Sequence, residues 1–387
     1  MDKSQRFPLL AKLYRGAMVR YARLTKGIDP DKAVFCCLQG RFYGDSPRCI
    51  SERLHERRPN TKIVWMLNSE TLQRVKDSLP DYVRVVRYRS REAFIEQATA
   101  RVWVDNFTKQ GGLKPAKGKQ FYIQTWHGDR AIKKIGYDMG TADDYRMEEL
   151  CDRVTTGSRF GEEMFRTAFR YKGEYIRAGS PRNDLLVRGD PADIRRVREG
   201  LGVPEGTKLL LYAPTYRENS RVVPKSAQMD LDRTLRCLEA TTGAPWKCLF
   251  RAHYLSQGID LEPVKDRIID VTRYEEMAEL LLAADMVLTD YSSCALDFIV
   301  RDLPALFYIA DWDEYVANRR VYFDIRETPF LVAADQDALE AQLHALTPEK
   351  ARQNCAAIRD YFGYYETGRA TDAAVEHIIR RLDGDLN

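Results

Sequence analysis

The sequence predicts an α/β protein built from two parallel β-sheets, each covered by helices on both faces. Short β-like runs alternate with helical stretches after Pro30, in two successive series. The chain has 387 residues, enough for two domains of ~150 residues each. Its composition, 44% hydrophobic and 30% charged, is ordinary for a globular protein and excludes a disordered, fibrous or polytopic membrane protein.

The first series of predicted strands covers residues 33–38, 62–67, 83–87, 101–104, 121–125, 153–156 and 174–177, with helices at 47–57 and 91–99. The second covers 208–212, 247–251, 267–271, 286–289 and 305–308, with helices at 230–241, 274–284 and 295–301. A stretch rich in Gly and Pro at 185–207 separates them. We therefore expect domains at residues 29–188 and 189–387. The final stretch, 348–386, is predicted as a helix interrupted near Gly363 and Gly368, which leaves it free to cross back to the first domain.

Residues 1–28 are predicted to form a basic amphipathic helix. They carry seven Lys and Arg against one Asp, which gives a charge of +6. One apolar arc, opposite most of the basic residues, collects Phe7, Leu10, Tyr14, Ala17, Tyr21 and Leu24. Such a helix suits the headgroup region of an anionic membrane. The alternative is a helix docked on its own domain with its basic face in water, and the residues alone leave both open.

Charge and cysteine usage exclude other classes. Lys+Arg 61 against Asp+Glu 57 is too balanced for a nucleic-acid coat, so no nucleic-acid partner is expected. The eight cysteines include no CxxC pair and several lie in apolar runs, which indicates reduced thiols in a cytosolic protein without a zinc site. No apolar run reaches the ~18 residues of a membrane span, and no signal peptide is visible.

Polar residues follow four of the predicted strands, where open parallel sheets bind their ligands. They are Trp126, His127 and Gly128 in the first series, then Thr215 with Arg217, Arg251 with His253, and Asp290 with Ser292 and Ser293. Two of the five histidines occupy such positions. We expect these two to face each other across a cleft, one from each domain.

Two of these strand ends favour particular chemistry. The hydroxyls and free N–H groups of residues 290–293 can bind a diphosphate, with Arg251 as a planar donor. The alternative is simple N-capping by Ser292 or Asp290. An imidazole pKa near ~6.5 suits His127 to proton removal at neutral pH. The alternative is a hydrogen-bonded core histidine.

Eight stretches carry a family likeness, in order along most of the chain: residues 40–48, 124–128 with 133–138, 180–184, 211–217, 251–253, 289–293 with 297–298, 320–324 and 368–371. In these stretches the sequence resembles the CDP-glycerol glycerophosphotransferases, which build teichoic acids and related polyol-phosphate polymers. The resemblance implies a GT-B fold, in which two Rossmann-like domains face each other across the active site. It also implies a peripheral enzyme at the cytoplasmic face of the cell membrane, held there by a basic amino terminus.

The implied reaction moves glycerol phosphate from CDP-glycerol to a hydroxyl of a lipid-linked saccharide or growing polyol-phosphate chain and releases CMP. His127 is then expected as the general base, and His253 as the group that stabilises departing CMP. Donor and phosphate ligands are expected among Arg251, Thr215, Arg217, Thr289, Asp290, Ser292, Ser293, Asp297, Arg319 and Arg320. The acceptor side is expected at Trp126, Gly128, Lys133, Lys134, Asp138, Arg182 and Asn183. No cofactor or protein-bound metal is predicted, and the need for a divalent ion stays open.

Two departures from the family pattern leave the polyol of the donor open. Thr328-Pro329-Phe330 stands where a Pro-Gly-Pro-like turn is usual, and the tail motif is degraded at residues 368–373. The length of the chain fits a primase that adds the first glycerol phosphate, and a short polymerase equally well. The rival functions are a GT-B glycosyltransferase that uses a nucleotide sugar and a non-catalytic, nucleotide-sensing membrane module.

Overall fold

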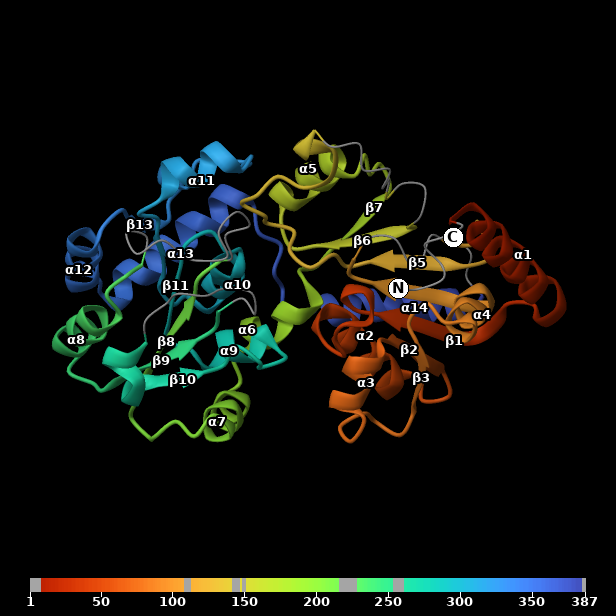
Figure 1. The fold of residues 1–387 in the computed structure, drawn as a ribbon, viewed down its shortest axis with the longest axis horizontal. Helices are drawn as coiled ribbons and strands as arrows, with labels where there is room; N and C mark the ends of the chain where they lie inside the picture. Colours follow the sequence, from red (N-terminus) through yellow and green to blue (C-terminus); the bar gives the residue numbers. More distant parts are fainter. Residues whose placement is uncertain are drawn as a thin grey trace.

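The computed structural model describes residues 8–107, 113–140, 147, 151–215, 228–252 and 261–384. Two α/β units lie side by side along the long axis of the molecule (Figure 1). Each is a parallel sheet with helices on both faces, which confirms the predicted fold class.

The first sheet has the strand order β3-β2-β1-β4-β5-β6-β7, and every neighbouring pair is parallel. Its strands are β1 (Asp29–Cys36), β2 (Lys62–Leu67), β3 (Val83–Arg87), β4 (Ala100–Asp105), β5 (Phe121–Gln124), β6 (Arg153–Thr156) and β7 (Glu174–Arg177). Helices α2 (Asp45–Arg57) and α3 (Ser69–Val75) contribute to the core on one face, and α4 (Arg91–Thr99) and α5 (Arg159–Ala168) to the core on the other. Central strands such as β2 are buried almost throughout, because both faces are covered.

The second sheet has the order β10-β9-β8-β11-β12-β13 and is also parallel throughout. Its strands are β8 (Lys208–Ala213), β9 (Trp246–Phe250), β10 (Ile268–Asp270), β11 (Met286–Thr289), β12 (Ala305–Tyr308) and β13 (Leu331–Ala333). Its helices are α6 (Asp184–Arg188), α7 (Pro191–Gly200), α8 (Leu231–Thr242), α9 (Met277–Ala283), α10 (Cys294–Phe298), α11 (Trp312–Asn318), α12 (Gln336–Ala345) and α13 (Pro348–Phe362). The short edge strand β13 was not predicted.

Helix ends follow the local chemistry of capping. The side chains of Ser90, Ser158 and Thr347 accept backbone N–H bonds at the starts of α4, α5 and α13. Gly243 and Gly363 end α8 and α13 in the left-handed conformation, which glycine adopts without steric cost.

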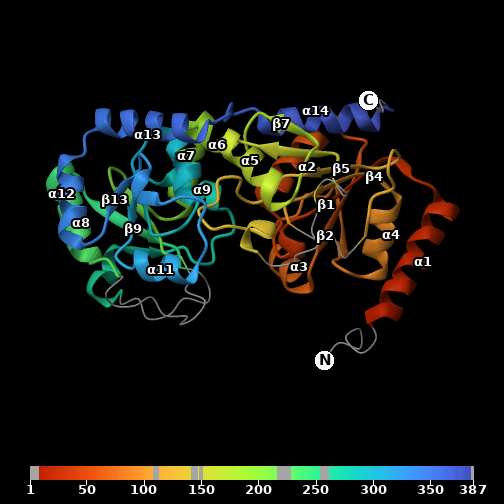
Figure 2. The same ribbon diagram turned by 90° about the horizontal axis from the view of Figure 1, so that it is seen from above.

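The last helix, α14 (Ala370–Leu382), returns to the first sheet. Ala374, Val375 and Ile378 are fully buried there among strand residues of the first core. By contrast, Ile358 and Phe362 of α13 belong to the second core. Figure 2 shows α13 and α14 along one edge of the molecule, spanning both units. The segment between α13 and α14 therefore connects the two units, as residues 178–191 also do.

Helix α1 (Pro8–Lys26) docks on the first unit through the face opposite the predicted apolar arc. Val19 and Ala22 are buried against Ala98, and Arg23 donates hydrogen bonds to Ala98 O and Lys114 O. The described members of the arc face outward: Tyr14, Tyr21 and Leu24 are 62%, 68% and 85% exposed. The helix thus buries part of its basic side and leaves its apolar side uncovered, a combination that neither alternative anticipated. None of the described helices has the length and apolarity needed to cross a bilayer.

Candidate functional site

The candidate site begins where the chain leaves β5. Trp126 adopts a left-handed φ of 51°, which is rare for a bulky residue. Its backbone N–H donates to Gln124 Oε1 at 2.9 Å, and its ring packs between Phe107 and Phe169. These contacts hold the strained turn that presents His127.

The proton on His127 is placed by its surroundings. Nδ1 lies 2.8 Å from the backbone oxygen of Asn106. A carbonyl oxygen only accepts, so Nδ1 carries the hydrogen and Nε2 keeps its lone pair. Burial lowers the pKa of His127, and the charge of Arg182 lowers it further, against the opposing effects of Asn106 and Asp45. The imidazole is therefore neutral at pH 7, with Nε2 able to accept a proton.

Asn106, directly after β4, orients this histidine and was not among the predicted site residues. It is fully buried, its Oδ1 accepts the Leu38 N–H at 2.8 Å, and its Nδ2 lies 3.3 Å from Cys37 Sγ. It thereby joins the loops that follow β1, β4 and β5. The rule that ligands lie beyond strand ends applies to β4 as much as to β5, so the sequence did contain a signal for Asn106.

The opposite wall is the turn of residues 290–293, between β11 and α10. Thr215 donates to Asp290 Oδ1 through both its N–H (2.8 Å) and its hydroxyl (2.6 Å), and Thr289 donates to Ala213 O at 2.6 Å. Ser292 Oγ accepts the Cys294 N–H at 3.3 Å, as the capping alternative requires. Ser293 makes no capping bond with its side chain. Thr215 and Asp290, both predicted as phosphate ligands, are therefore hydrogen-bonded to each other.

The two walls approach each other at Gly128. A Cβ atom added there would lie 3.5 Å from Ser293 Oγ and 3.9 Å from Arg182 Nη2. The sequence assigned Gly128 and Arg182 to the acceptor side and Ser293 to the donor side. The structure brings all three to one place.

Arg251 follows β9 on the second wall. Burial lowers the pKa of its guanidinium, with Cys294, Glu276 and Glu275 opposing that shift. Its buried Nη1 has no hydrogen-bond partner within the described ranges. The predicted residues His253 and Arg217 lie outside those ranges.

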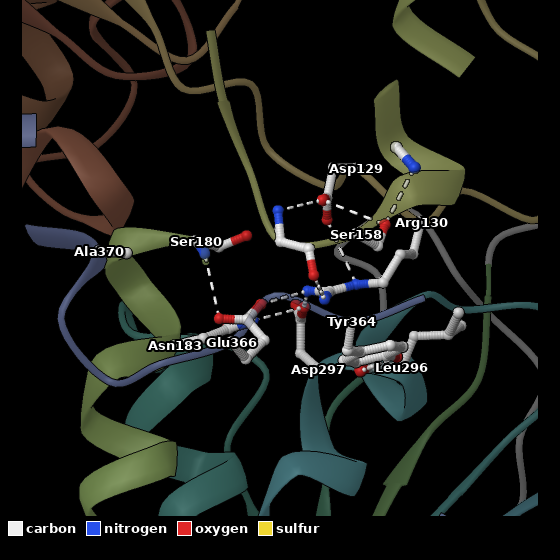
Figure 3. Close-up of polar contacts among 12 residues, drawn as sticks. Asp129, Arg130, Ser158, Ser180, Asn183, Leu296, Asp297, Tyr364, Glu366 and Ala370 are labelled. Carbon is white, nitrogen blue, oxygen red and sulfur yellow. Dashed lines mark hydrogen bonds and ion pairs between the residues drawn. The ribbon is translucent and has the colours of Figure 1, made fainter. Parts of the chain in front are cut away.

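A buried charge network lies behind the two turns (Figure 3). Asp297 Oδ1 accepts bonds from Arg130 Nη2 (2.9 Å) and Asn183 Nδ2 (3.0 Å), and Oδ2 accepts one from Arg182 Nη2 (2.9 Å). Burial alone would raise the pKa of Asp297, but Arg182 and Arg130 lower it overall. The carboxylate is thus ionised and is bound by the side chains of Arg130, Arg182 and Asn183, whereas the sequence predicted that it would bind the donor.

Glu366, between α13 and α14, completes this network. Its Oε1 accepts bonds from Arg130 Nη2 (2.8 Å) and Asn183 Nδ2 (2.9 Å), and its Oε2 accepts the Ser180 N–H at 3.1 Å (Figure 3). Burial raises the pKa of Glu366 to about 7, and Asp129 adds to the shift while Arg130 opposes it. The segment that crosses between the units is therefore anchored to the base of the site.

The remaining predicted residues lie at a second seam between the units. Lys134 N–H donates to Arg320 O, and Tyr322 N–H donates to Ile132 O, each at 2.9 Å. The Tyr322 hydroxyl donates to Asp138 Oδ2 at 2.8 Å. The seam thus brings together residues predicted on opposite sides of the site: Lys133, Lys134 and Asp138 with Arg319 and Arg320.

Glu276 makes a third contact between the units, which sequence reasoning missed. Both its carboxylate oxygens lie 3.3 Å from the Asp45 nitrogen, at the start of α2, and Arg48 Nη1 lies 3.6 Å away. Burial raises the pKa of Glu276 to about 7, against the effect of Arg48. A pocket of about 520 Å³ opens beside it, between α2, α6, α9 and α14, and Arg182 is among its lining residues.

Within the described ranges, no group of three or more His, Cys, Asp or Glu side chains is arranged to hold a metal ion. The groups that the described site brings together include the His127 imidazole, the Ser293 hydroxyl and the Arg182 guanidinium.

Comparison with known proteins is consistent with this geometry. Residues 17–380 match the family described as CDP-Glycerol:Poly(glycerophosphate) glycerophosphotransferase. The teichoic acid poly(glycerol phosphate) polymerase of Bacillus subtilis (strain 168) is 28% identical over 390 residues, which cover 96% of this chain and 51% of that protein. Its counterpart from Bacillus spizizenii is 29% identical over 366 residues, which cover 89% of this chain and 91% of that protein. The chain therefore spans about half the length of the first relative and most of the second.

Solved structures extend the likeness to the whole fold. The wall teichoic acid polymerase TagF has a TM-score of 0.82 at 27% identity, covering 99% of this chain and 97% of that one. A histidine-to-asparagine variant of TagF soaked with CDPG has a TM-score of 0.80 at 26% identity, covering 100% of both chains. The two units are the Rossmann-like domains of a GT-B fold. The chain belongs to the CDP-glycerol:poly(glycerophosphate) glycerophosphotransferase family.

Proposed function

We propose that this chain transfers glycerol phosphate from CDP-glycerol to a hydroxyl of a lipid-linked saccharide or growing polyol-phosphate chain and releases CMP. The observation that carries the proposal is the neutral His127, whose Nε2 keeps its lone pair, directly before Gly128, where the Ser293 hydroxyl of the second domain approaches, in a chain of this family. The relatives named as glycerol phosphate polymerases support the same reaction class.

The step needs one proton acceptor and charge neutralisation. The acceptor oxygen attacks the phosphorus that carries glycerol, and a new P–O bond forms. The bond from that phosphorus to the bridging oxygen breaks, and its electron pair leaves on the phosphate of CMP. The hydroxyl proton passes to His127 Nε2. Positioning and electrostatic stabilisation supply most of the rate enhancement in such transfers.

The second domain is proposed to hold the donor diphosphate. Ser293 offers a hydroxyl that is not used in capping, and Arg251 offers a buried N–H without a described partner. A guanidinium in this state binds phosphate without first losing another bond. Ser292 and His253 are proposed to contribute to the same subsite, with His253 stabilising CMP as it departs.

A substrate panel tests the proposal. The purified chain is incubated with CDP-glycerol, CDP-ribitol or UDP-sugars and a lipid-linked or short soluble acceptor, and CMP and UDP release are measured separately. We expect CMP release that depends on both CDP-glycerol and acceptor. UDP release would instead support a nucleotide-sugar transferase, and binding without turnover would support a nucleotide sensor. The lengths of the products distinguish a primase, which adds one unit, from a polymerase.

We also propose that α1 places the enzyme on the cytoplasmic leaflet, beside its lipid-linked acceptor. The support is the exposed row of Tyr14, Tyr21 and Leu24 on a helix that is otherwise docked. Aromatic and apolar side chains in such a row suit the boundary between headgroups and acyl chains. Vesicle binding tests this, as set out in the Discussion.

A further inference from the structure

We propose that Arg182 is a catalytic residue: its guanidinium contacts the phosphoryl group in transit, and Asp45 and Asp297 are the positioning residues that hold it there. The inference rests on the proposed function and deepens it. It moves Arg182 from the acceptor side, where the sequence placed it, to the reacting centre.

The first support is position. Arg182 Nη2 lies 3.9 Å, and Ser293 Oγ 3.5 Å, from the point where a Gly128 side chain would begin. Gly128 has a φ of +156° and directly follows His127. Arg182 is also close enough to His127 for its charge to act on the imidazole. A phosphoryl group between the base and the Ser293 hydroxyl would therefore lie within reach of this guanidinium.

The second support is the way in which Arg182 is held. Its side chain is only 12% exposed. Nη1 lies 3.3 Å from Asp45 Oδ2, and Nη2 lies 2.9 Å from Asp297 Oδ2. These carboxylates raise the pKa of Arg182 even though burial opposes this, so the guanidinium stays charged. The two bonds use two of the five N–H donors of a guanidinium.

The third support is the strain at Asp45. This residue has a left-handed φ of 59° at the start of α2, and Glu276 of the second domain contacts its N–H. Non-glycine residues persist in that conformation when their surroundings hold them there, and they gather at functional sites. Asp45 is therefore bound to both domains, through Glu276 and through Arg182, at a point beside His127.

The fourth support is the distribution of the other positive charges. Transferred phosphoryl groups spread negative charge over three oxygens, and a planar guanidinium stabilises that charge effectively. The predicted cations Lys133, Lys134 and Arg320 meet through their backbones at the seam of residues 132–134 and 320–322. The Arg130 side chain is only 1% exposed and pairs with Asp129, Asp297 and Glu366, so it lies deeper than Arg182. Arg182 is the guanidinium that the first domain brings next to Gly128 and Ser293.

The experiment measures steady-state kinetics and donor binding for Arg182→Gln, Arg182→Lys and Asp45→Asn in the full chain. We expect Arg182→Gln to lower kcat by about 10²-fold or more, while the Kd for CDP-glycerol changes by about threefold or less, because the lost interaction forms in the transition state. Arg182→Lys keeps the charge without the planar fork, so we expect a fall of about tenfold. The matched control is Arg188→Gln, an exposed arginine on α6, with kcat unchanged.

The pH profile tests whether Arg182 and Asp45 act on His127, as distinct from a loss of folding. The groups that act on His127 are the Asn106 carbonyl, Asp45 and Arg182. Removing the positive charge of Arg182 should move the ascending limb of kcat/KM to higher pH, and removing the negative charge of Asp45 should move it to lower pH. A loss of folding alone would not produce opposite shifts.

Each outcome bears on the inference. A folded Arg182→Gln variant with near-normal kcat overturns it, and so does a loss confined to donor Kd or to thermal stability. Should Arg182→Gln not fold, a normal kcat in folded Arg182→Lys together with an unshifted profile in Asp45→Asn also overturns it. If the wild-type chain releases no CMP, the proposed function itself is overturned. If the wild type and Arg182→Gln are both active, only the inference about Arg182 is overturned.

Discussion

The turn that carries His127 and the turn that carries Ser293 face each other, but they are stabilised differently. Around His127 the supports are aromatic rings and the buried amide Asn106. In the opposite turn, hydrogen bonds join Thr215 to Asp290, both predicted as ligands. A polar residue beyond a strand can therefore be scaffold or ligand. The difference between the two lies in whether its donors and acceptors are already used.

The largest effect is expected at His127, because its Nε2 atom is the proposed proton acceptor. His127→Ala should lower kcat by at least ~10²-fold while the protein stays folded, because the proton acceptor is lost. His55→Ala is the matched control: this histidine of the same domain lies in the last turn of α2 and stacks on Tyr82. Turnover is followed as CMP release, and folding by circular dichroism. Near-normal turnover in folded His127→Ala would remove the histidine from the mechanism.

The next effect sharpens the difference between scaffold and ligand within one turn. Ser292→Ala removes the acceptor of the Cys294 N–H bond, so it should cost about 1 kcal/mol of stability. Ser293→Ala removes a hydroxyl without a capping bond, so it should weaken CDP-glycerol binding about tenfold and leave the Tm nearly unchanged. Calorimetry measures both quantities. Equal losses of stability in the two variants would mean that both serines are scaffold.

A smaller, pH-dependent effect is expected from Glu366, which lies beneath both turns. Burial raises its pKa from 4.5 to about 7, so the folded state keeps a proton that the unfolded state has lost. Its contribution to stability is thus present below about pH 4.5 and is lost as the pH rises to about 7. The Tm of the wild type minus that of Glu366→Gln should fall across this window. A difference that is flat or rises with pH contradicts the prediction.

Changes in α1 are expected to have the smallest effect on turnover but a clear effect on membrane binding. Replacing Tyr14, Tyr21 and Leu24 with serine should release the protein from anionic vesicles, while turnover on a short soluble acceptor stays within about twofold. Tyr361→Ser, an exposed tyrosine on α13, is the control. Because Arg23 bonds the domain itself, salt should weaken vesicle binding only in part. Unchanged co-sedimentation of the triple variant would place any membrane contact elsewhere.

Much of the fold could be predicted from the sequence because buried parallel strands are short apolar runs bounded by turn residues. Strands β2, β3, β6, β7, β11 and β12 begin and end as predicted. The edge strand β13 also lies in a short apolar run, residues 330–334, but it is only three residues long and partly buried, and it was not predicted. The apolar arc of α1 was also recognised. Periodicity states which residues share a face, but it does not state what covers that face.

The candidate site was predictable to the level of strand ends and no further. The strand-end rule singled out positions 127 and 293, on two turns that the structure brings together at Gly128, but it does not tell which neighbours already hydrogen-bond to a polar group. Asp297 illustrates this: its three bonds go to residues more than 100 positions earlier in the chain. Asn106 follows β4 and Asp45 lies in the family-like stretch 40–48, but neither position tells how the residue acts: Asn106 acts through its backbone carbonyl and Asp45 through a strained turn.

The return of α14 to the first sheet has a consequence for synthesis on the ribosome. A domain that is contiguous in sequence can fold as soon as its last residue emerges, before the next one is made. Here Ala374, Val375 and Ile378 supply core contacts to strands of the first sheet, the last of which, β7, ends at Arg177. The first domain must therefore wait, with part of one sheet face uncovered, until α14 has been made. Its folding is tied to completion of the second domain, so a fragment that stops at residue 188 would lack one of the layers that make it stable.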